Sequence, residues 1–360
     1  MQEKIVAFLT PAMLYLIIFV FNAFLPGRWV KGYINKPHSS EKMSYHLNGI
    51  LVFFIMVTGW FLLGYFELVP FDWLYRYRWY ELIGAFAIGI LFSLIVVLPF
   101  PKIRKNFAAD FYYGRIENLQ WIGGRIDAKM WLYLAGAIVL ELNALSFTAH
   151  HLMLFGTASS TGIILTTILL TYFVVDYLTF EEVHLYTYDL FAERVGFKLG
   201  WGCLVFYPYF YAIPLWSTVD LPNAHTPDWL YLFFVLIFLT GWSLSRGANL
   251  QKFYFKKDPT KPFLGILPQT ISNGQQRLLV NGFWGISRHV NYLGEILMAT
   301  GIVLCTGHPT LFWPWLYPLY YVFLLFPRQQ EDDVRCSLKY GPLWDEYKAK
   351  VPYRIIPRIY

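Results

Sequence analysis

The residues best suited to chemistry lie near the C-terminus, where charged and aromatic side chains are denser than anywhere upstream. Four of them recur at intervals of four, three and four residues: Arg328, Asp332, Arg335 and Lys339. In a helix this spacing places all four on one narrow face. Cations in such a row can hold phosphates, and the carboxylate can accept protons from hydroxyl groups. A helix lying against lipid head groups, with its charges in water, explains the same row equally well.

Two further groups of residues could close a site around such a ligand. One group precedes an apolar helix and contains Trp284, Arg288, His289, Asn291 and Tyr292. The other occupies one helical face upstream and contains Asn249, Lys252 and Lys256. Two like charges on one face repel each other unless an anion lies between them, and both a nucleotide phosphate and a lipid head group meet that need. The chain has no G-x-G-x-x-G after a strand and no P-loop, so side chains would have to hold any nucleotide.

A second signal is a set of carboxylates in or at the end of an apolar stretch. Asp176, Glu181 and Glu182 lie there, with Tyr172 one helical turn before Asp176. An ionisable group in a membrane span is costly and therefore suggests function. Burial keeps such a carboxyl protonated, so that it can act as an acid. The alternative is structural: Asp176 ties two helices together, and the two glutamates mark the water boundary.

Composition places the chain in a membrane. It has 360 residues, of which 57% are hydrophobic and 14% are charged, whereas a soluble domain carries about 25% charged residues. The first apolar run lacks a basic leader and a cleavage site, so we interpret it as a retained span. The three cysteines have no metal or redox spacing, and we expect no metal. The net charge of +6 fits basic membrane-facing loops, with lipid as a partner and no nucleic acid.

Apolar stretches able to span a bilayer recur along the chain. We place nine, and allow for a tenth, at residues 5–25, 49–65, 80–100, 130–147, 163–180, 199–216, 229–244, 292–306 and 311–326. The predicted fold class is all-α, a polytopic integral membrane protein with a cytoplasmic helical cap over a ligand pocket. The one domain-like break falls near Leu244 and separates residues 1–244 from 245–360. After it we predict a helix over 241–257 and a loop closed by Asn273-Gly274.

Lysine and arginine orient the chain. They concentrate in the first, third, fifth and seventh connections and in the tail, and of the even-numbered connections only the second carries any, Arg76 and Arg78. Basic connections stay on the cytoplasmic side of a membrane. We therefore expect the candidate ligand-binding cations to face the cytoplasm, of an endoplasmic reticulum membrane in a eukaryote or an inner membrane in a bacterium.

Several segments together resemble the sterol reductase family, which includes the delta-14 and delta-7 reductases and the membrane part of the lamin B receptor. The similarity covers residues 45–360 and includes Y-x-x-N-G at 45–49, D-F-Y-x-G at 110–114 and D-x-K at 127–129. Further matches are F-E-E at 180–182, N-x-Q-K-x-x-F at 249–255 and G-F-W-G…R-H-x-N-Y-x-G at 282–294. The most specific matches are that last block and the ending R-C-x-x-K-Y-G…V-P-Y-R-I from 335 to 355.

The resemblance implies NADPH-dependent reduction of a sterol carbon–carbon double bond inside the membrane, with delta-14 preferred and delta-7 or delta-24-type reduction open. It implies a dinucleotide pocket made by Lys252, Lys256, Trp284, His289, Asn291, Tyr292, Arg328, Asp332, Arg335, Lys339 and Tyr347. Residues 1–244 would then form the lipid-accessible sterol half, and 245–360 the cofactor-binding half. The reaction needs an acid and a hydride donor, and the candidate acids are Tyr172, Asp176 and Glu181.

The chain departs from the family pattern at a few positions. Val290 replaces a usual proline, and Glu331 occupies a usual arginine position, which weakens the cationic pocket unless Glu331 points away. Two other functions stay open. An S-adenosylmethionine-dependent methyltransferase of the isoprenylcysteine type shares R-H-x-x-Y-x-G and an acidic, aromatic tail, but has no use for Lys252 and Lys256. A non-catalytic sterol-binding protein would keep the fold without the reaction.

Overall fold

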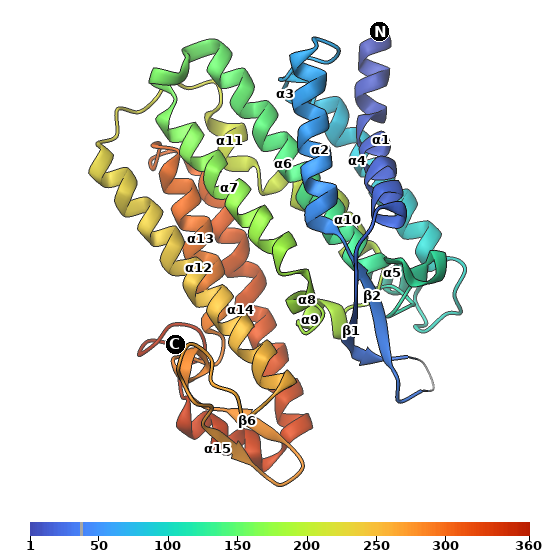
Figure 1. Cartoon of the computed structure of the whole chain (residues 1–360), viewed down its shortest axis with the longest axis vertical. Coiled ribbons are helices and arrows are strands. Elements are labelled where there is room, and N and C mark those ends of the chain that lie inside the picture. The colour runs from blue at the N-terminus through green and yellow to red at the C-terminus, as the bar shows by residue number, and fades with distance from the viewer. Residues whose placement is uncertain (37–38) are drawn as a thin grey trace. The chain divides into compact units, whose positions relative to one another are not determined.

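The computed structural model describes residues 1–36 and 39–360. The chain divides into two compact units, Met1–Asn223 and Ala224–Tyr360, each with its own packed interior (Figure 1). Both units are mainly helical, which confirms the predicted fold class. Leu244 lies inside a continuous helix of the second unit. The division of labour between a sterol half and a cofactor half stays a prediction.

The first unit is built from long apolar helices joined by short elements. Its long helices are α1 (Gln2–Phe24), α2 (Gly49–Tyr65), α4 (Arg78–Val97), α6 (Ala128–Phe155) and α7 (Thr161–Thr179). Its short helices are α3 (Trp73–Arg76), α5 (Phe107–Tyr113), α8 (Glu181–His184), α9 (Tyr188–Phe191), α10 (Phe197–Trp201) and α11 (Ile213–Thr218), with 3₁₀ turns Ile122–Gly124 and Thr157–Ser159.

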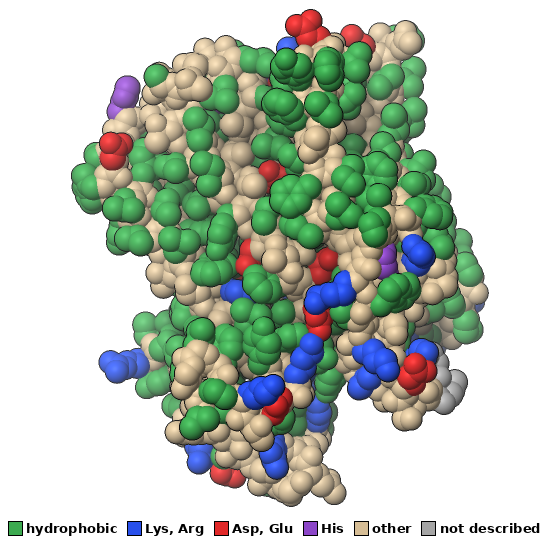
Figure 2. Space-filling model, in the orientation of Figure 1, with side chains coloured by type: hydrophobic (Ala, Val, Ile, Leu, Met, Phe, Trp, Pro, Cys, Tyr) green, Lys and Arg blue, Asp and Glu red, His purple; other side chains and the backbone are tan. Residues whose placement is uncertain are grey.

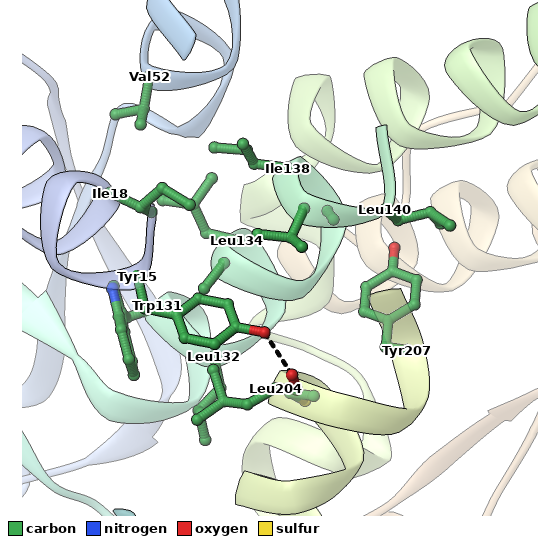
Figure 3. Close-up of a cluster of buried hydrophobic side chains, with 14 of the residues drawn as sticks. Tyr15, Ile18, Val52, Trp131, Leu132, Leu134, Ile138, Leu140, Leu204 and Tyr207 are labelled. Atoms are coloured by element: carbon green, nitrogen blue, oxygen red, sulfur yellow. Dashed lines mark hydrogen bonds between the residues drawn. The ribbon is translucent and has the colours of Figure 1, made fainter. Parts of the chain in front are cut away.

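Helix α6 is the centre of the first unit. Asp127 caps its N-terminus by accepting hydrogen bonds from the backbone N–H groups of Lys129 and Met130. Its apolar side chains, among them Leu134 and Ile138, are buried against α1, α2 and the segment 202–210 (Figure 3). The Tyr15 hydroxyl of α1 donates to the Leu204 carbonyl within this cluster. The helix is therefore a buried scaffold on which neighbouring helices are positioned.

The span predicted over residues 199–216 is wrong as a single helix. The structure has α10, then a π-helix over Gly202–Phe210, then α11. Pro208 and Pro214 lie in this stretch, and a proline removes a backbone donor and crowds the preceding turn. Asn143 of α6 donates its side-chain amide to the Pro208 carbonyl at 3.0 Å, which satisfies an acceptor in the irregular stretch.

The other eight predicted spans are helical, in differing lengths. Among the described residues, α1, α4, α6, α7 and α12 (Asp228–Lys257) are long and apolar enough to cross a membrane. The apolar helices α2 and α13 (Val290–Cys305) are shorter. The span predicted over 311–326 is the first half of α14 (Phe312–Tyr340).

The second unit packs α12, α13, α14 and α15 (Pro342–Lys350) with the 3₁₀ turn Gly282–Gly285. Glycine lets α12 and α13 approach closely, because a Cβ on Gly241 would lie 2.6 Å from the Gly294 carbonyl oxygen. The predicted helix over 241–257 is the continuation of α12 rather than a separate element. The loop after it carries a β-hairpin, with Asn273-Gly274 at its turn as predicted.

Strands form only short antiparallel pairs among the described residues. They are β1 (Arg28–Asn35) with β2 (Lys42–Leu47), β3 (Gln120–Trp121) with β4 (Ile126–Asp127), and β5 (Thr270–Ser272) with β6 (Arg277–Leu279). On the face drawn in Figure 2, many Lys and Arg side chains lie over the β1–β2 hairpin and over the region of β6 and α15, whereas hydrophobic side chains cover much of the long helices. This distribution is typical of helices that face lipid and connections that face water.

Candidate functional site

The row of charged residues on α14 is helical, as its spacing predicts. Arg328, Asp332, Arg335 and Lys339 all lie within Phe312–Tyr340, which continues without a break beyond its apolar first half. The prolines inside this helix, Pro318 and Pro327, precede all four residues. The predicted face therefore exists as one continuous surface, formed by the last three turns of a long helix.

Lys252 of α12 lies beside this face. Its ammonium is within electrostatic range of Asp332, Arg335 and Lys339, and its Nζ lies 5.1 Å from the centre of the Trp284 ring. Lys256, one turn further along α12, is within range of Lys252, Lys339 and Asp332. The convergence of α12 and α14 that the sequence predicts is thus present inside the second unit. We call Lys252, Lys256, Asp332, Arg335 and Lys339 the cationic cluster.

Four cations and one carboxylate make up the cationic cluster. These cations repel one another, and partial burial strengthens that repulsion. Phosphate groups relieve it, and arginine in particular binds them in two-pronged geometry. The arrangement therefore fits a ligand that carries more than one phosphate.

Two hydrogen bonds to α12 hold Trp284 and its turn in place beside Lys252. Its indole Nε1 donates to the Ala248 carbonyl of α12 at 2.8 Å. The backbone N–H of Phe283 donates to the Gln251 side-chain oxygen at 2.9 Å. Gly282 has φ +63°, and a Cβ there would collide with the Gln251 amide, so this turn needs glycine. Gln251 is therefore a positioning residue. The sequence contains it in the motif N-x-Q-K-x-x-F, but the motif alone does not indicate this role.

Tyr347 is buried rather than presented to a ligand. Its ring packs against Trp344, and its hydroxyl donates to the Trp284 carbonyl at 3.3 Å. Burial, the largest influence, raises the pKa of this hydroxyl, so that it remains a donor. The structure thus places Tyr347 where it supports the Trp284 turn. The predicted direct contact with a cofactor stays a prediction.

His289, Asn291 and Tyr292 lie at the start of α13. The rings of His289 and Tyr292 stack with centroids 4.8 Å apart. Burial, with the charges of Lys252, Arg288 and Arg354, lowers the pKa of His289 to about 3, so the imidazole is neutral at physiological pH. Asn291 donates to the Asn249 side chain at 3.5 Å, while its own buried carbonyl oxygen has no partner among the described residues. That oxygen is an acceptor that a ligand amide or hydroxyl can satisfy.

Arg288 closes the site from the other side by holding the tail. Its guanidinium donates to the carbonyls of Val351 and Pro352 at 3.1 and 3.0 Å, and its backbone N–H donates to the Tyr353 carbonyl at 2.9 Å. Nη1 of Arg288 therefore binds the chain itself, whereas its buried Nε has no partner among the described residues. Arg288 and His289 are adjacent in the sequence, so the motif R-H does not distinguish them. The structure shows that Arg288 binds the C-terminal tail.

The candidate acids lie in the first unit. Tyr172 and Asp176 are one turn apart on α7, and both are partly exposed. Glu181 on α8 is buried, and it accepts a hydrogen bond from the Gly49 backbone N–H at the start of α2 at 3.0 Å. Burial raises the pKa of Glu181 to about 7, against the opposing effects of that hydrogen bond and Arg28. The carboxyl group can therefore hold a proton near neutral pH.

A further carboxyl in the same unit is Glu141, which the sequence predicts as a packing contact rather than an acid. Glu141 of α6 is 1% exposed, and one of its oxygens accepts from the Thr171 hydroxyl at 2.8 Å. The other oxygen has no partner among the described residues. Thr171 is the neighbour of Tyr172 in α7. A glutamate in an apolar helix is rare and suggests a functional group, but a packing contact between helices explains the same residue.

Comparison with known proteins decides the family. The family model described as the ergosterol biosynthesis ERG4/ERG24 family matches residues 3–360. The chain belongs to the ERG4/ERG24 family. A Delta(14)-sterol reductase of Arabidopsis thaliana is 31% identical over 96% of this chain and 95% of its own length. Proteins of the same name from Methylotuvimicrobium alcaliphilum and Schizosaccharomyces pombe are 31% and 30% identical, each over 93% of this chain and 79% and 80% of their own lengths.

Membership of the ERG4/ERG24 family confirms the predicted resemblance, and the match begins well before Tyr45, where sequence reading started it. Family membership also agrees with the helical, membrane-spanning architecture. The family motifs that lie in the first unit correspond to structural contacts. Asn48 of Y-x-x-N-G, for example, accepts from Asn22 at 2.6 Å, and Lys129 of D-x-K donates to the Leu190 carbonyl at 2.6 Å.

Proposed function

We propose that this protein reduces a sterol carbon–carbon double bond in the membrane, with the delta-14 bond as its substrate bond and NADPH as hydride donor. The observation that carries the proposal is similarity along nearly the whole chain to proteins named Delta(14)-sterol reductase. The cationic cluster supports the cofactor part, because a reductase needs a redox cofactor and this cluster suits a phosphorylated one.

NADPH fits the residues of the second unit better than NADH does. NADPH carries a 2′-phosphate in addition to its pyrophosphate, and the cationic cluster supplies cations for both. Lys252, Arg335 and Lys339 would hold phosphate oxygens, and Asp332 would accept from a ribose hydroxyl. When bound, NADPH supplies a hydride. The unpartnered oxygen of Asn291, beside the neutral His289, suits an amide donor and disfavours a carboxylate at that place.

The candidate proton donors of this proposal are residues of the first unit. Reduction of an isolated alkene needs protonation of one carbon before the other accepts hydride, and an apolar site protects the cation from water. Tyr172 and Asp176 lie on α7, whereas the Glu181 carboxyl binds the N-terminus of α2. Glu181→Gln keeps that hydrogen bond and removes the acid. If Glu181→Gln loses turnover while its fold is unchanged, Glu181 is the proton donor. If turnover is unchanged, the variants Tyr172→Phe and Asp176→Asn test the two remaining candidates.

The activity test is a product assay. Membranes containing the protein are given NADPH and three sterols in turn, unsaturated at delta-14, at delta-7 or in the side chain, and the products are identified by mass. We expect the delta-14 sterol to gain two hydrogens. Reduction of only the delta-7 or side-chain sterol would contradict the delta-14 assignment, and no reduction of any sterol would indicate a non-catalytic sterol-binding protein. Methyl transfer from S-adenosylmethionine would instead favour the methyltransferase.

The cofactor test is Lys252→Glu, with Lys348→Glu as the matched control. Lys348 lies in the same unit and pairs with Asp345 at 2.8 Å, outside the cationic cluster. Hydrogen bonds to charged groups contribute about 1.5–3 kcal/mol, and reversal adds repulsion, so we expect NADPH affinity to fall by roughly 100-fold or more. NADPH fluorescence in titrations measures it. Equal affinity in both variants, with both folded, would contradict the proposed phosphate site.

A further inference from the structure

A tight turn follows the last turn of α12. Phe263 and Ile266 exchange two backbone hydrogen bonds, of 3.0 and 2.9 Å, around the two residues Leu264 and Gly265. Both of these residues have positive φ, +49° for Leu264 and +78° for Gly265. This is the backbone of a two-residue hairpin whose central positions favour asparagine, aspartate and glycine.

Leucine at such a position is unfavourable in water for two separate reasons. A left-handed conformation costs a residue with a Cβ roughly 1–2 kcal/mol. The side chain is also 75% exposed, and that of Leu267, just beyond the turn, is 67% exposed. Asparagine would remove both costs. A residue that violates local rules without a compensating contact in its own chain indicates a function outside that chain.

The turn packs on the side of α12 that faces lipid. Leu232 and Leu236 are exposed on this membrane-spanning helix. Tyr254 lies 18 residues after Leu236, which is five helical turns, and so shares its face. Tyr254 is exposed as well, and the ring of Phe263 stacks on it with centroids 5.9 Å apart. The turn at 263–267 therefore continues the apolar stripe of α12.

Its depth corresponds to the boundary of a bilayer. Tyr254 is 26 residues after the first residue of α12, Asp228, which is roughly 39 Å along the axis. A hydrocarbon core is about 30 Å thick, and the bilayer with its head groups is about 40–45 Å. Phe263 stacks at the level of Tyr254 rather than beyond the end of the helix. The turn thus lies where lipid head groups begin.

Basic residues flank the turn on the chain. Lys257 ends α12, and Lys261 is highly exposed, with Asp258 3.8 Å away as a weak partner. Lysine near a membrane surface gains about 1 kcal/mol from anionic lipids. Exposed leucines beside exposed lysines at the end of a span fit a head-group layer.

We propose that residues 263–267 form an interfacial anchor. Leu264 and Leu267 insert into the head-group boundary of the bilayer that α12 crosses, and Lys257 and Lys261 bind anionic lipid head groups. Insertion removes the exposure that is unfavourable in water, and it ties the loop that leads into the Trp284 turn to the membrane surface. This inference is independent of which reaction the protein catalyses.

The test places a fluorescent label at Leu264→Cys in the full-length protein, reconstituted in phosphatidylcholine nanodiscs with and without phosphatidylserine. Cys203 and Cys305 are buried, and Cys336→Ser removes the remaining partly exposed thiol. Gln275→Cys, in the exposed β5–β6 turn, is the matched control. We expect doxyl lipid to remove most of the fluorescence at 264 and iodide to remove little, with the reverse at 275. Phosphatidylserine should increase the loss at 264.

Three outcomes would overturn the proposal. Equal iodide quenching at 264 and 275 would place the turn in water. Protection from iodide without quenching by lipid would place a protein surface over it. Quenching that does not respond to phosphatidylserine would remove the lysines from the anchor. Leu264→Asn supplies a second check: the turn should unfold at the same or a higher temperature, while a label at Leu267→Cys loses its lipid quenching.

Discussion

The two units treat buried charge differently. In the first unit several buried ionic groups have a defined partner within the fold, although one oxygen each of Glu81 and Glu141 has none among the described residues. Arg115 contacts the Asp110 carboxylate at 2.9 Å, Lys129 donates to the Leu190 carbonyl at 2.6 Å, and Glu181 accepts from Gly49 at 3.0 Å. Such groups stabilise the connections between membrane helices. These groups therefore bind other parts of the same fold, and Glu181 can in addition gain or lose a proton near neutral pH.

In the second unit the cationic cluster brings several cations and the Asp332 carboxylate within electrostatic range of Lys252 and Lys256. Like charges this close repel one another more strongly where water is partly excluded. An anionic ligand bound there would reduce that repulsion. Burial alone therefore does not separate a structural ionic group from a candidate binding one, whereas the close approach of several cations does distinguish the second unit.

The largest expected effect is in the first unit. Arg115→Met removes the guanidinium that holds Asp110 and the carbonyls of Val97 and Phe100. Breaking a buried pair from one side costs about 3–5 kcal/mol, so the free energy of unfolding should fall by that amount. Thermal unfolding in detergent measures it. The double variant with Asp110→Asn should recover part of the loss, and additive losses would show that the two residues do not act as a pair.

The pH dependence of stability should have opposite signs in the two units. The pKa of Glu181 is raised to about 7 in the folded protein. Its protonated carboxyl therefore adds to the free energy of unfolding at low pH. This stabilisation is lost as pH rises from 4.5 to about 7, by roughly 3 kcal/mol. The pKa of His289 is lowered to about 3 in the folded protein. Its neutral imidazole therefore adds to the free energy of unfolding above pH 6.5. This stabilisation is lost as pH falls below 6.5, at about 1.4 kcal/mol per pH unit. Hydrogen exchange at several pH values resolves each unit.

The variants that check this prediction are Glu181→Gln and His289→Gln. Each should flatten the pH dependence of its own unit and leave that of the other unchanged. If both variants alter the same unit, or if the wild-type units respond to pH with the same sign, the contrast between them is wrong in this respect.

The smallest expected effect comes from removing one cation of the cationic cluster. Lys256→Gln should raise the unfolding free energy of the ligand-free protein by about 1 kcal/mol, because it relieves repulsion, while it weakens NADPH binding. Lys129→Gln in the first unit should instead lower it, since the Leu190 carbonyl loses a charged donor. Calorimetry with and without NADPH measures both. A loss of stability in Lys256→Gln would place that residue among the structural ionic groups.

Much of the second unit could be predicted from local spacing. The intervals between Arg328, Asp332, Arg335 and Lys339 already implied one helical face, and α14 provides it. The structure places Lys252 within electrostatic range of Asp332, Arg335 and Lys339, whereas the ligand that the charge pattern predicts stays a prediction. The burial of Tyr347 against Trp344 could not be predicted, because an aromatic residue in a polar tail reads equally well as a ligand contact or as packing.

In the first unit, periodicity found the helices but not their irregularities. Residues 199–216 are apolar enough to predict a span, yet a π-helix interrupts them, because a proline there is accommodated by the Asn143 amide from another helix. The hydrogen bond between Glu181 and Gly49 joins positions far apart in the chain, so no local pattern contains it.

By itself, the sequence determined that the chain is a helical membrane protein, which family it resembles, and which residues share a helical face. These follow from composition and from a period of 3.6 residues, both of which are local properties. The tertiary structure decided which charges face which, which aromatic residues are buried, and where a helix is interrupted. Those depend on partners from distant segments, and electrostatic and packing energies act through space rather than along the chain.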